Sequence, residues 1–194
     1  MPTAKKFAPR ASRVEWKAIV CAVALLAAPL ALAAQPATVI LVRHAEKASQ
    51  TESDPALSAE GSQRAKDLAT ALADAGIGSV ITTHLQRTKL TAAGVLEATK
   101  LSPIVIQAGG ATHAADVAAA VRARPAGEVV LVVGHSNTVT AIIGALGGPK
   151  MGNICDSQYS NLFIMQMTTP APKLIRANYG KGDPADPACT NTMK

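Results

Sequence analysis

The chain has 194 residues with a formal net charge of +6 at pH 7, and only two Phe, two Tyr and one Trp are present. The positive charge lies mainly at the N-terminus, because residues 34–194 hold 14 basic and 12 acidic side chains and carry only +2. Without a basic stripe that alternates with aromatics, nucleic acid is excluded as an expected partner. The core must be built from Val, Ile, Leu and Ala.

Residues 1–33 have the pattern of a secretory signal peptide. Five basic residues precede an uncharged run over 18–34, which is short and alanine-rich for a membrane span. The run ends in small side chains, which predicts cleavage just before Ala34 or Gln35. We therefore expect an exported protein, periplasmic or secreted, whose domain spans 34–194 and keeps no stable membrane anchor. The alternative is an uncleaved amphipathic or membrane anchor.

From residue 38 onward, short aliphatic runs alternate with alanine-rich helical periods. This alternation predicts one three-layer α/β domain, with a largely parallel sheet and helices on both faces. The expected strands are 38–42, 79–82, 104–106 and 128–133. The expected helices are one capped by Ser58 and ended by Gly76, then 86–99, 114–123 and 137–146. Residues 159–167 and 173–178 flank a proline-containing turn and predict an antiparallel C-terminal edge.

Three cysteines are present, and Cys21 lies in the predicted signal peptide. Cys155 and Cys189 remain, and two cysteines in an exported chain predict one disulfide. Two free buried thiols are the alternative. Neither cysteine has a His or Cys partner at metal-binding spacing, so we expect no zinc site.

Two of the predicted strands end in a histidine. Arg43 and His44 follow the aliphatic run at 38–42, and His135 follows the run at 128–133 after a single glycine. Ligands of open α/β sheets bind at the carboxyl ends of the strands. A helix start at Ser136 would add backbone amides that favour an anion. The two histidines are therefore candidates for one anion-binding site.

Four segments in chain order resemble the markers of the histidine phosphatase superfamily, the phosphoglycerate-mutase-like proteins. They are Leu-Val-Arg-His-Ala-Glu at 41–46, Leu-Ser-Ala-Glu-Gly-Ser-Gln-Arg-Ala at 57–65, Thr-Thr-His-Leu-Gln-Arg-Thr-Lys-Leu-Thr-Ala at 82–92 and Gly-His-Ser at 134–136. The region from 38 to 146 covers most of the predicted domain. The resemblance implies a phosphatase that uses no metal or other cofactor.

The resemblance also implies a role for each matched residue. His44 is the expected nucleophile, which forms a phosphohistidine and needs a backbone carbonyl to fix its tautomer. Arg43 and Arg87 are expected to hold the phosphoryl oxygens, since a guanidinium fork matches phosphate. His135 is expected to stabilise the charge that develops on the transferred group. His84 has no matched role.

The acid that protonates the leaving group stays open. Many members of the superfamily carry a Glu after the third strand, but this chain has none there. His113 and Asp116 are the nearest candidates, and Glu46 beside the nucleophile is the third. The absence of a strong acid suits good leaving groups, such as those of phosphohistidine or acyl phosphates.

The expected substrate is a phosphorylated small molecule, an envelope glycolipid or a phosphoprotein. A catalytically weak or inactive relative that only binds a phosphorylated ligand is the alternative. A serine hydrolase is disfavoured, because Gly-His-Ser-Asn-Thr lacks the second glycine of the nucleophile elbow and no histidine follows His135. A mutase is disfavoured, because its substrates are cytosolic whereas the N-terminus predicts export.

Overall fold

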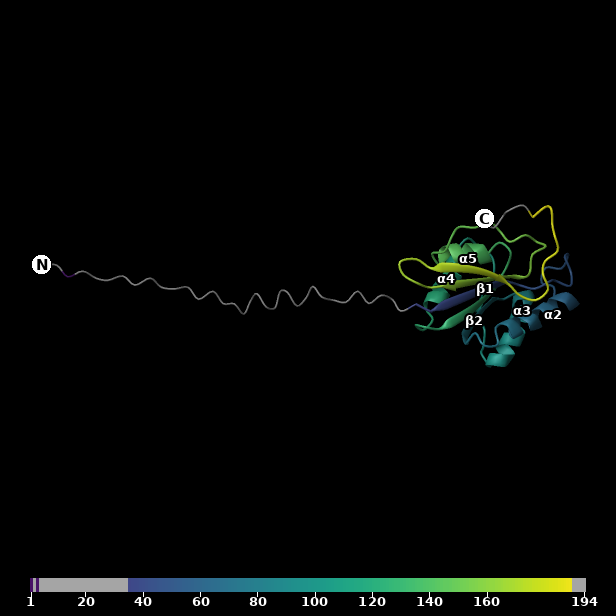
Figure 1. The fold of residues 1–194 in the computed structure, drawn as a ribbon, viewed down its shortest axis with the longest axis horizontal. Helices are drawn as coiled ribbons and strands as arrows, with labels where there is room; N and C mark the ends of the chain where they lie inside the picture. The colour runs from purple at the N-terminus through teal and green to yellow at the C-terminus, as the bar shows by residue number, and fades with distance from the viewer. Residues whose placement is uncertain (2, 4–34, 190–194) are drawn as a thin grey trace. The chain divides into compact units, whose positions relative to one another are not determined.

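The computed structural model describes Met1, Thr3 and residues 35–189. The predicted signal peptide, apart from Met1 and Thr3, and the predicted boundary after residue 33 lie outside the described residues. The described part folds as a sheet with helices on both faces (Figure 1). Its strands are β1 Thr38–Arg43, β2 Ile77–Thr83, β3 Ile104–Ile106, β4 Val129–Gly134, β5 Asn161–Gln166 and β6 Lys173–Asn178. Its helices are α2 Ala59–Ala71, α3 Gln86–Thr99, α4 His113–Arg122 and α5 Val139–Ala145.

The strand order is β3-β2-β4-β1-β5-β6. β3, β2, β4 and β1 run parallel, and β5 and β6 continue the sheet in antiparallel pairing. The largely parallel sheet and its antiparallel C-terminal edge are thus confirmed. The carboxyl ends of the four parallel strands meet at one edge of the sheet.

Each face of the sheet buries one aliphatic cluster. Val39 and Leu41 of β1 face the cluster under α4 and α5, and Ile40 and Val42 face the one under α2 and α3. Because β1 is covered on both sides, it is apolar at every central position, as parallel strands between two helical layers are. Figure 1 shows α4 and α5 on one side of β1 and α2 and α3 on the other.

Helix α2 begins as predicted and ends earlier than predicted. Ser58 caps it, since the Ser58 hydroxyl accepts the Gly61 N–H at 3.0 Å. The helix ends at Ala71, and the prediction that Gly76 ends it is wrong. The chain leaves the helix through turns, because Ala73 N–H donates to the Thr70 carbonyl and Ala75 N–H to the Leu72 carbonyl. Gly76, with φ of 66°, instead precedes β2.

The C-terminal strand pair also starts later than predicted. β5 begins at Asn161 rather than at residue 159, because the Asp183 carboxylate accepts the N–H groups of Tyr159 and Ser160. Cys155 and Cys189 form the predicted disulfide, with their Cα atoms 5.7 Å apart, so the alternative of two free thiols is wrong. Within the described residues, no helix is long and apolar enough to cross a membrane.

Gly61 provides a test of how the segment after β1 packs on α2. A Cβ at Gly61 would collide with the backbone carbonyl of Glu46, whereas one at Gly144 in α5 has no atom within 4 Å. We expect Gly61→Ala to lower the free energy of unfolding by about 1–3 kcal/mol, as overpacking does. Gly144→Ala should raise it by roughly 0.5–1 kcal/mol, because Ala is the better helix former. Urea unfolding measures both, and equal effects at the two sites would contradict this packing.

Candidate active site

A cavity of about 420 Å³ lies at the carboxyl ends of the parallel strands. Arg43 ends β1 and His44 follows it, His135 follows β4, Arg87 lies in the first turn of α3 after β2, and His113 begins α4 after β3. These five side chains line the cavity together. The fold thus brings together the four residues singled out by the family resemblance and one of the three candidate acids.

The backbone of β1 and its neighbours fixes the position of His44. Its N–H donates to the Gly134 carbonyl at 2.9 Å, which extends the pairing of β1 with β4 by one residue. The next residue, Ala45, donates its N–H to the Thr91 hydroxyl of α3 at 2.9 Å. Thr91 belongs to the third marker segment, so this hydrogen bond joins the third marker segment to the first.

The His44 ring has a fixed tautomer and a lowered pKa. Its Nδ1 lies 2.8 Å from the Ala45 carbonyl, so Nδ1 carries the proton and Nε2 keeps its lone pair. Burial, opposed by the Ala45 carbonyl and aided by the Arg43, His135 and Arg87 charges, lowers the pKa of His44 to about 3. His44 is therefore neutral at physiological pH, as attack on phosphorus requires.

His135 lies beside His44 with the ring centroids 5.4 Å apart. Its Nε2 is 3.2 Å from the Thr83 hydroxyl at the end of β2. Burial, followed by the charge on Arg87, lowers the pKa of His135 to about 4. Ser136 also lines the cavity, and its carbonyl accepts the Ile154 N–H at 2.9 Å.

The two arginines are held differently. One terminal nitrogen of Arg43, Nη1, donates to the carbonyls of Cys155, Asp156 and Gln158 at 2.8, 3.0 and 3.0 Å. The guanidinium also lies over the Tyr159 ring, 4.1 Å from its centroid. Burial lowers the pKa of Arg43 from its ordinary value, and the nearby acidic groups oppose this.

Arg87 has a looser environment. Its Nη1 lies 3.7 Å from a carboxylate oxygen of Asp54, and both side chains are partly exposed. An exposed pair at this distance contributes little to stability. The guanidinium is therefore free to bind an anion in the cavity.

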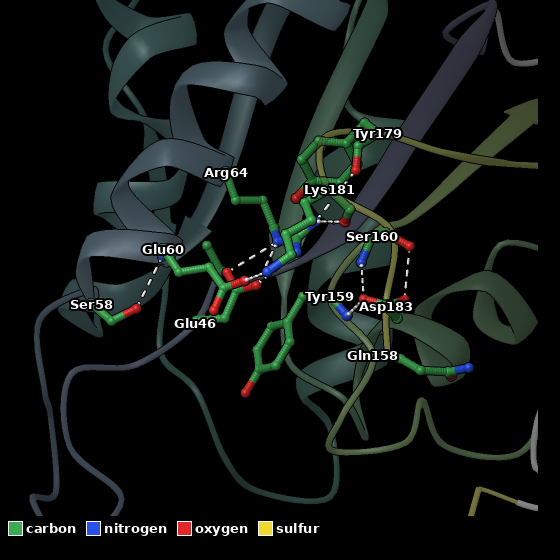
Figure 2. A network of polar contacts seen from close by, with 12 residues as sticks. Glu46, Ser58, Glu60, Arg64, Gln158, Tyr159, Ser160, Tyr179, Lys181 and Asp183 are labelled. Carbon is green, nitrogen blue, oxygen red and sulfur yellow. Dashed lines mark hydrogen bonds and ion pairs between the residues drawn. The ribbon is translucent and has the colours of Figure 1, made fainter. Parts of the chain in front are cut away.

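The three candidate acids occupy different places. His113 is buried in the cavity wall with its Nδ1 2.8 Å from the Gln107 carbonyl. Asp116 lies one turn farther along α4, exposed and outside the residues that line the cavity. Glu46 does not line the cavity, and its carboxylate pairs with Arg64, 2.7 Å from Nη2 (Figure 2). Only His113 reaches the site.

Three buried nitrogens in the cavity wall lack hydrogen-bond partners. Seven buried side-chain nitrogen or oxygen atoms within the described residues are unpartnered, and three of them are Arg43 Nε, Arg87 Nε and His113 Nε2. A buried polar atom without a partner is destabilising unless a ligand or water satisfies it. Because Arg43, Arg87 and His113 line one cavity together with His44, these atoms indicate a site for an oxyanion. Within residues 35–189, no group of three or more His, Cys, Asp or Glu is arranged to hold a metal ion.

Some site residues were missed by the sequence analysis. Lys47 and the pair Gly109 and Gly110 line the cavity, and Tyr159 stacks on Arg43. The carbonyls that hold Arg43 carry no signal in a sequence, because every residue has one. Tyr159 had a weak signal, since it is one of only two tyrosines in the chain.

Comparisons with known proteins agree with this arrangement. Residues 39–109 match the model of the histidine phosphatase superfamily, branch 1. No functionally curated protein matches the sequence significantly.

Solved structures share the fold at low sequence identity. A candidate phosphohistidine phosphatase, SixA, of Agrobacterium tumefaciens is 20% identical with a TM-score of 0.56, over 75% of this chain and 99% of that chain. A phosphoserine phosphatase of Entamoeba histolytica is 14% identical with a TM-score of 0.53, over 74% and 96%. A mycobacterial glucosyl-3-phosphoglycerate phosphatase is 18% identical with a TM-score of 0.51, over 75% and 99%.

The lowered pKa values predict how the two site histidines titrate. We expect His44 and His135 to stay neutral as the pH falls from 8 to 5, because their pKa values are about 3 and about 4. Imidazole C2–H resonances report this in an NMR titration, with His44→Gln and His135→Gln identifying the signals. The unfolded chain binds these protons near pH 6.5, so the stability contributed at high pH is lost as the pH falls from 6.5 toward 3. A midpoint near 6.5 for either folded residue would contradict the described burial.

Proposed function

We propose that this protein, whose residues 39–109 match the model of the histidine phosphatase superfamily, is a phosphohydrolase that cleaves phosphate monoesters through a phosphohistidine on His44. The observation that carries the proposal is the set of three buried, unpartnered nitrogens around a neutral histidine. The structural relatives named as phosphatases of phosphohistidine, phosphoserine and glucosyl-3-phosphoglycerate support a phosphatase-type activity.

The first step is phosphoryl transfer to His44. The phosphoryl oxygens bind at Arg43 Nε and the Arg87 guanidinium, whose charges stay constant throughout the reaction. His44 Nε2 then attacks phosphorus in line with the leaving oxygen, while the N–H of His135 stabilises the transferred group. These cations and donors supply the positive charge, and so we propose that the reaction needs no metal ion.

The leaving oxygen needs a proton, and we assign its donor to His113. The Nδ1–H of His113 is committed to the Gln107 carbonyl, so only Nε2 exchanges a proton with the cavity. Protonated His113 gives the Nε2 proton to the leaving oxygen as its bond to phosphorus breaks. Neutral His113 then takes a proton from the water that attacks phosphohistidine, which releases inorganic phosphate and regenerates neutral His44.

The substrate we propose is a phosphorylated small molecule, an envelope glycolipid or a phosphoprotein. Beside the site, a Cβ at Gly109 or Gly110 would meet no atom within 4 Å, which supports room for a leaving group beyond the phosphoryl pocket. We also propose that the protein acts after export, in the periplasm or outside the cell. The Cys155–Cys189 disulfide supports that location, because disulfides persist in oxidising compartments.

A covalent intermediate is the direct test of the mechanism. Phosphate ester labelled in the phosphoryl group should label the protein, and the label should survive an alkaline quench and be lost in acid, as a phosphoramidate is. His44→Ala should abolish both label and turnover, whereas His135→Ala should slow turnover by roughly 10²- to 10³-fold. Mapping the label to Ser136, or finding full activity in His44→Ala, would rule the mechanism out. A protein that binds phosphate esters without turnover would be the inactive relative instead.

The dependence on the leaving group tests His113. In His113→Gln, we expect kcat/KM for an alkyl phosphate such as glycerol phosphate to fall by about 10²- to 10⁴-fold, the usual contribution of a general acid. p-Nitrophenyl phosphate should be affected much less, because its leaving group departs without a proton. The control is Asp116→Asn, which should match the wild type on both substrates. Equal losses on both substrates in His113→Gln would contradict the assignment.

A further inference from the structure

The guanidinium of Arg43 belongs to β1 but is held from the other end of the chain. Within the described residues, all its hydrogen bonds go to residues 155–159. Three of them run from Nη1 to backbone carbonyls, and the buried Nε has no hydrogen-bond partner. The orientation of this phosphate-binding side chain therefore depends on where those carbonyls lie.

The segment that supplies these contacts, residues 155–160, is named the Arg43 cradle. It has neither helix nor strand, and it contains a turn in which the Gln158 N–H donates to the Cys155 carbonyl at 3.0 Å. The C-terminal tail, residues 179–189, supplies further contacts that hold this segment in place. Asp183 accepts the N–H groups of Tyr159 and Ser160 at 2.7 and 3.0 Å and the Ser160 hydroxyl at 2.7 Å (Figure 2).

The other end of the cradle is also tied to the tail. The Ser157 hydroxyl donates to the Asp186 carboxylate at 2.6 Å. Cys155, whose carbonyl accepts from Arg43 at 2.8 Å, is joined covalently to Cys189. The cradle is thus fixed at its first residue by the disulfide and at its last two by Asp183.

The tail in turn is anchored on α2. Arg64 Nη1 donates to the carbonyls of Tyr179 and Lys181 at 3.3 and 2.9 Å. The Lys181 ammonium lies 3.0 Å from Glu60 in the first turn of the helix, as an exposed ion pair (Figure 2). The Arg64 contacts connect the tail to the core, whereas the Lys181 pair is peripheral and contributes little.

We infer that the C-terminal tail positions Arg43, and that Asp183 and the Cys155–Cys189 disulfide together set the affinity of the site for phosphoryl groups. This inference rests on the proposed function. It adds that the affinity of the site for phosphoryl groups depends on the redox state of the Cys155–Cys189 disulfide. A dithiol reductant gives two electrons and two protons to the disulfide and becomes a disulfide itself, leaving two thiols. Cys155 of the cradle is then no longer bonded to Cys189. The carbonyls that orient Arg43 are held less firmly, so the guanidinium is less well positioned before an oxyanion binds. Asp183 is a positioning residue, since it acts only through the cradle.

Phosphate affinity in the two redox states tests the inference directly. The mature protein is titrated with inorganic phosphate by calorimetry, before and after reduction with dithiothreitol, and KM and kcat are measured in parallel for p-nitrophenyl phosphate. We expect Kd and KM to rise by roughly tenfold on reduction, the effect of losing about one charge-assisted hydrogen bond, and to recover on reoxidation. Measuring phosphate binding separates the outcomes, because an inactive protein can still show the redox effect.

Variants distinguish positioning from mere stabilisation. Asp183→Ala, with the disulfide intact, should raise Kd and KM as reduction does. Asp183→Asn keeps an oxygen for the Tyr159 and Ser160 N–H groups and should restore most of the affinity. The control is Lys181→Met, which removes a tail contact outside the cradle and should leave Kd unchanged. Melting temperatures of all forms show how much each change destabilises the fold.

The inference is overturned if reduced protein and Asp183→Ala bind phosphate as tightly as the oxidised wild type while melting at lower temperature. That result would make the tail a purely structural element, since loss of folded protein lowers apparent kcat and leaves KM unchanged. Turnover without any redox effect on Kd would reject the inference and leave the proposed function standing. Absence of both turnover and phosphate binding in the oxidised protein would reject the two together.

Discussion

The in-register parallel pairing of β1 and β4 is the constraint on which the site depends. Arg43 lies opposite Gly134, so the residues that follow, His44 and His135, leave the sheet side by side. Their ring centroids are 5.4 Å apart as a consequence. A shift of one residue in this register would turn one histidine to the other face of the sheet. The buried aliphatic faces of both strands hold the register in place.

Burial at this edge of the sheet has a chemical effect as well as a structural one. It lowers the pKa values of both imidazoles, and the nearby arginine charges act in the same direction. The same low-polarity surroundings strengthen the attraction of Arg43 and Arg87 for an oxyanion. A neutral His44 imidazole beside two permanently charged guanidinium groups therefore results from one feature of the fold.

The marker segments are also connected to the C-terminal tail. Gly61 lets α2 approach the backbone of Glu46, and Arg64 pairs with the Glu46 carboxylate while binding the tail. Glu46, two residues after His44, thus serves the scaffold. The same tail contacts the Arg43 cradle, which in turn binds the Arg43 guanidinium. Segments far apart in sequence converge on one guanidinium, which makes its position a property of the whole domain.

The sequence by itself determined the sheet, the histidines at its strand ends and the disulfide partners. Aliphatic runs predict buried parallel strands, and residues placed just after such strands must lie at the same edge of the sheet. Tertiary structure decided which candidate acid lines the cavity and which residues hold Arg43. Nothing in the sequence ranks His113 above Asp116 or Glu46. Asp116 is only one helical turn away from His113, and Glu46 lies outside the cavity because it pairs with Arg64. The partners of Arg43 are backbone carbonyls, which all residues possess, so only the folded path of the chain shows which carbonyls bind it.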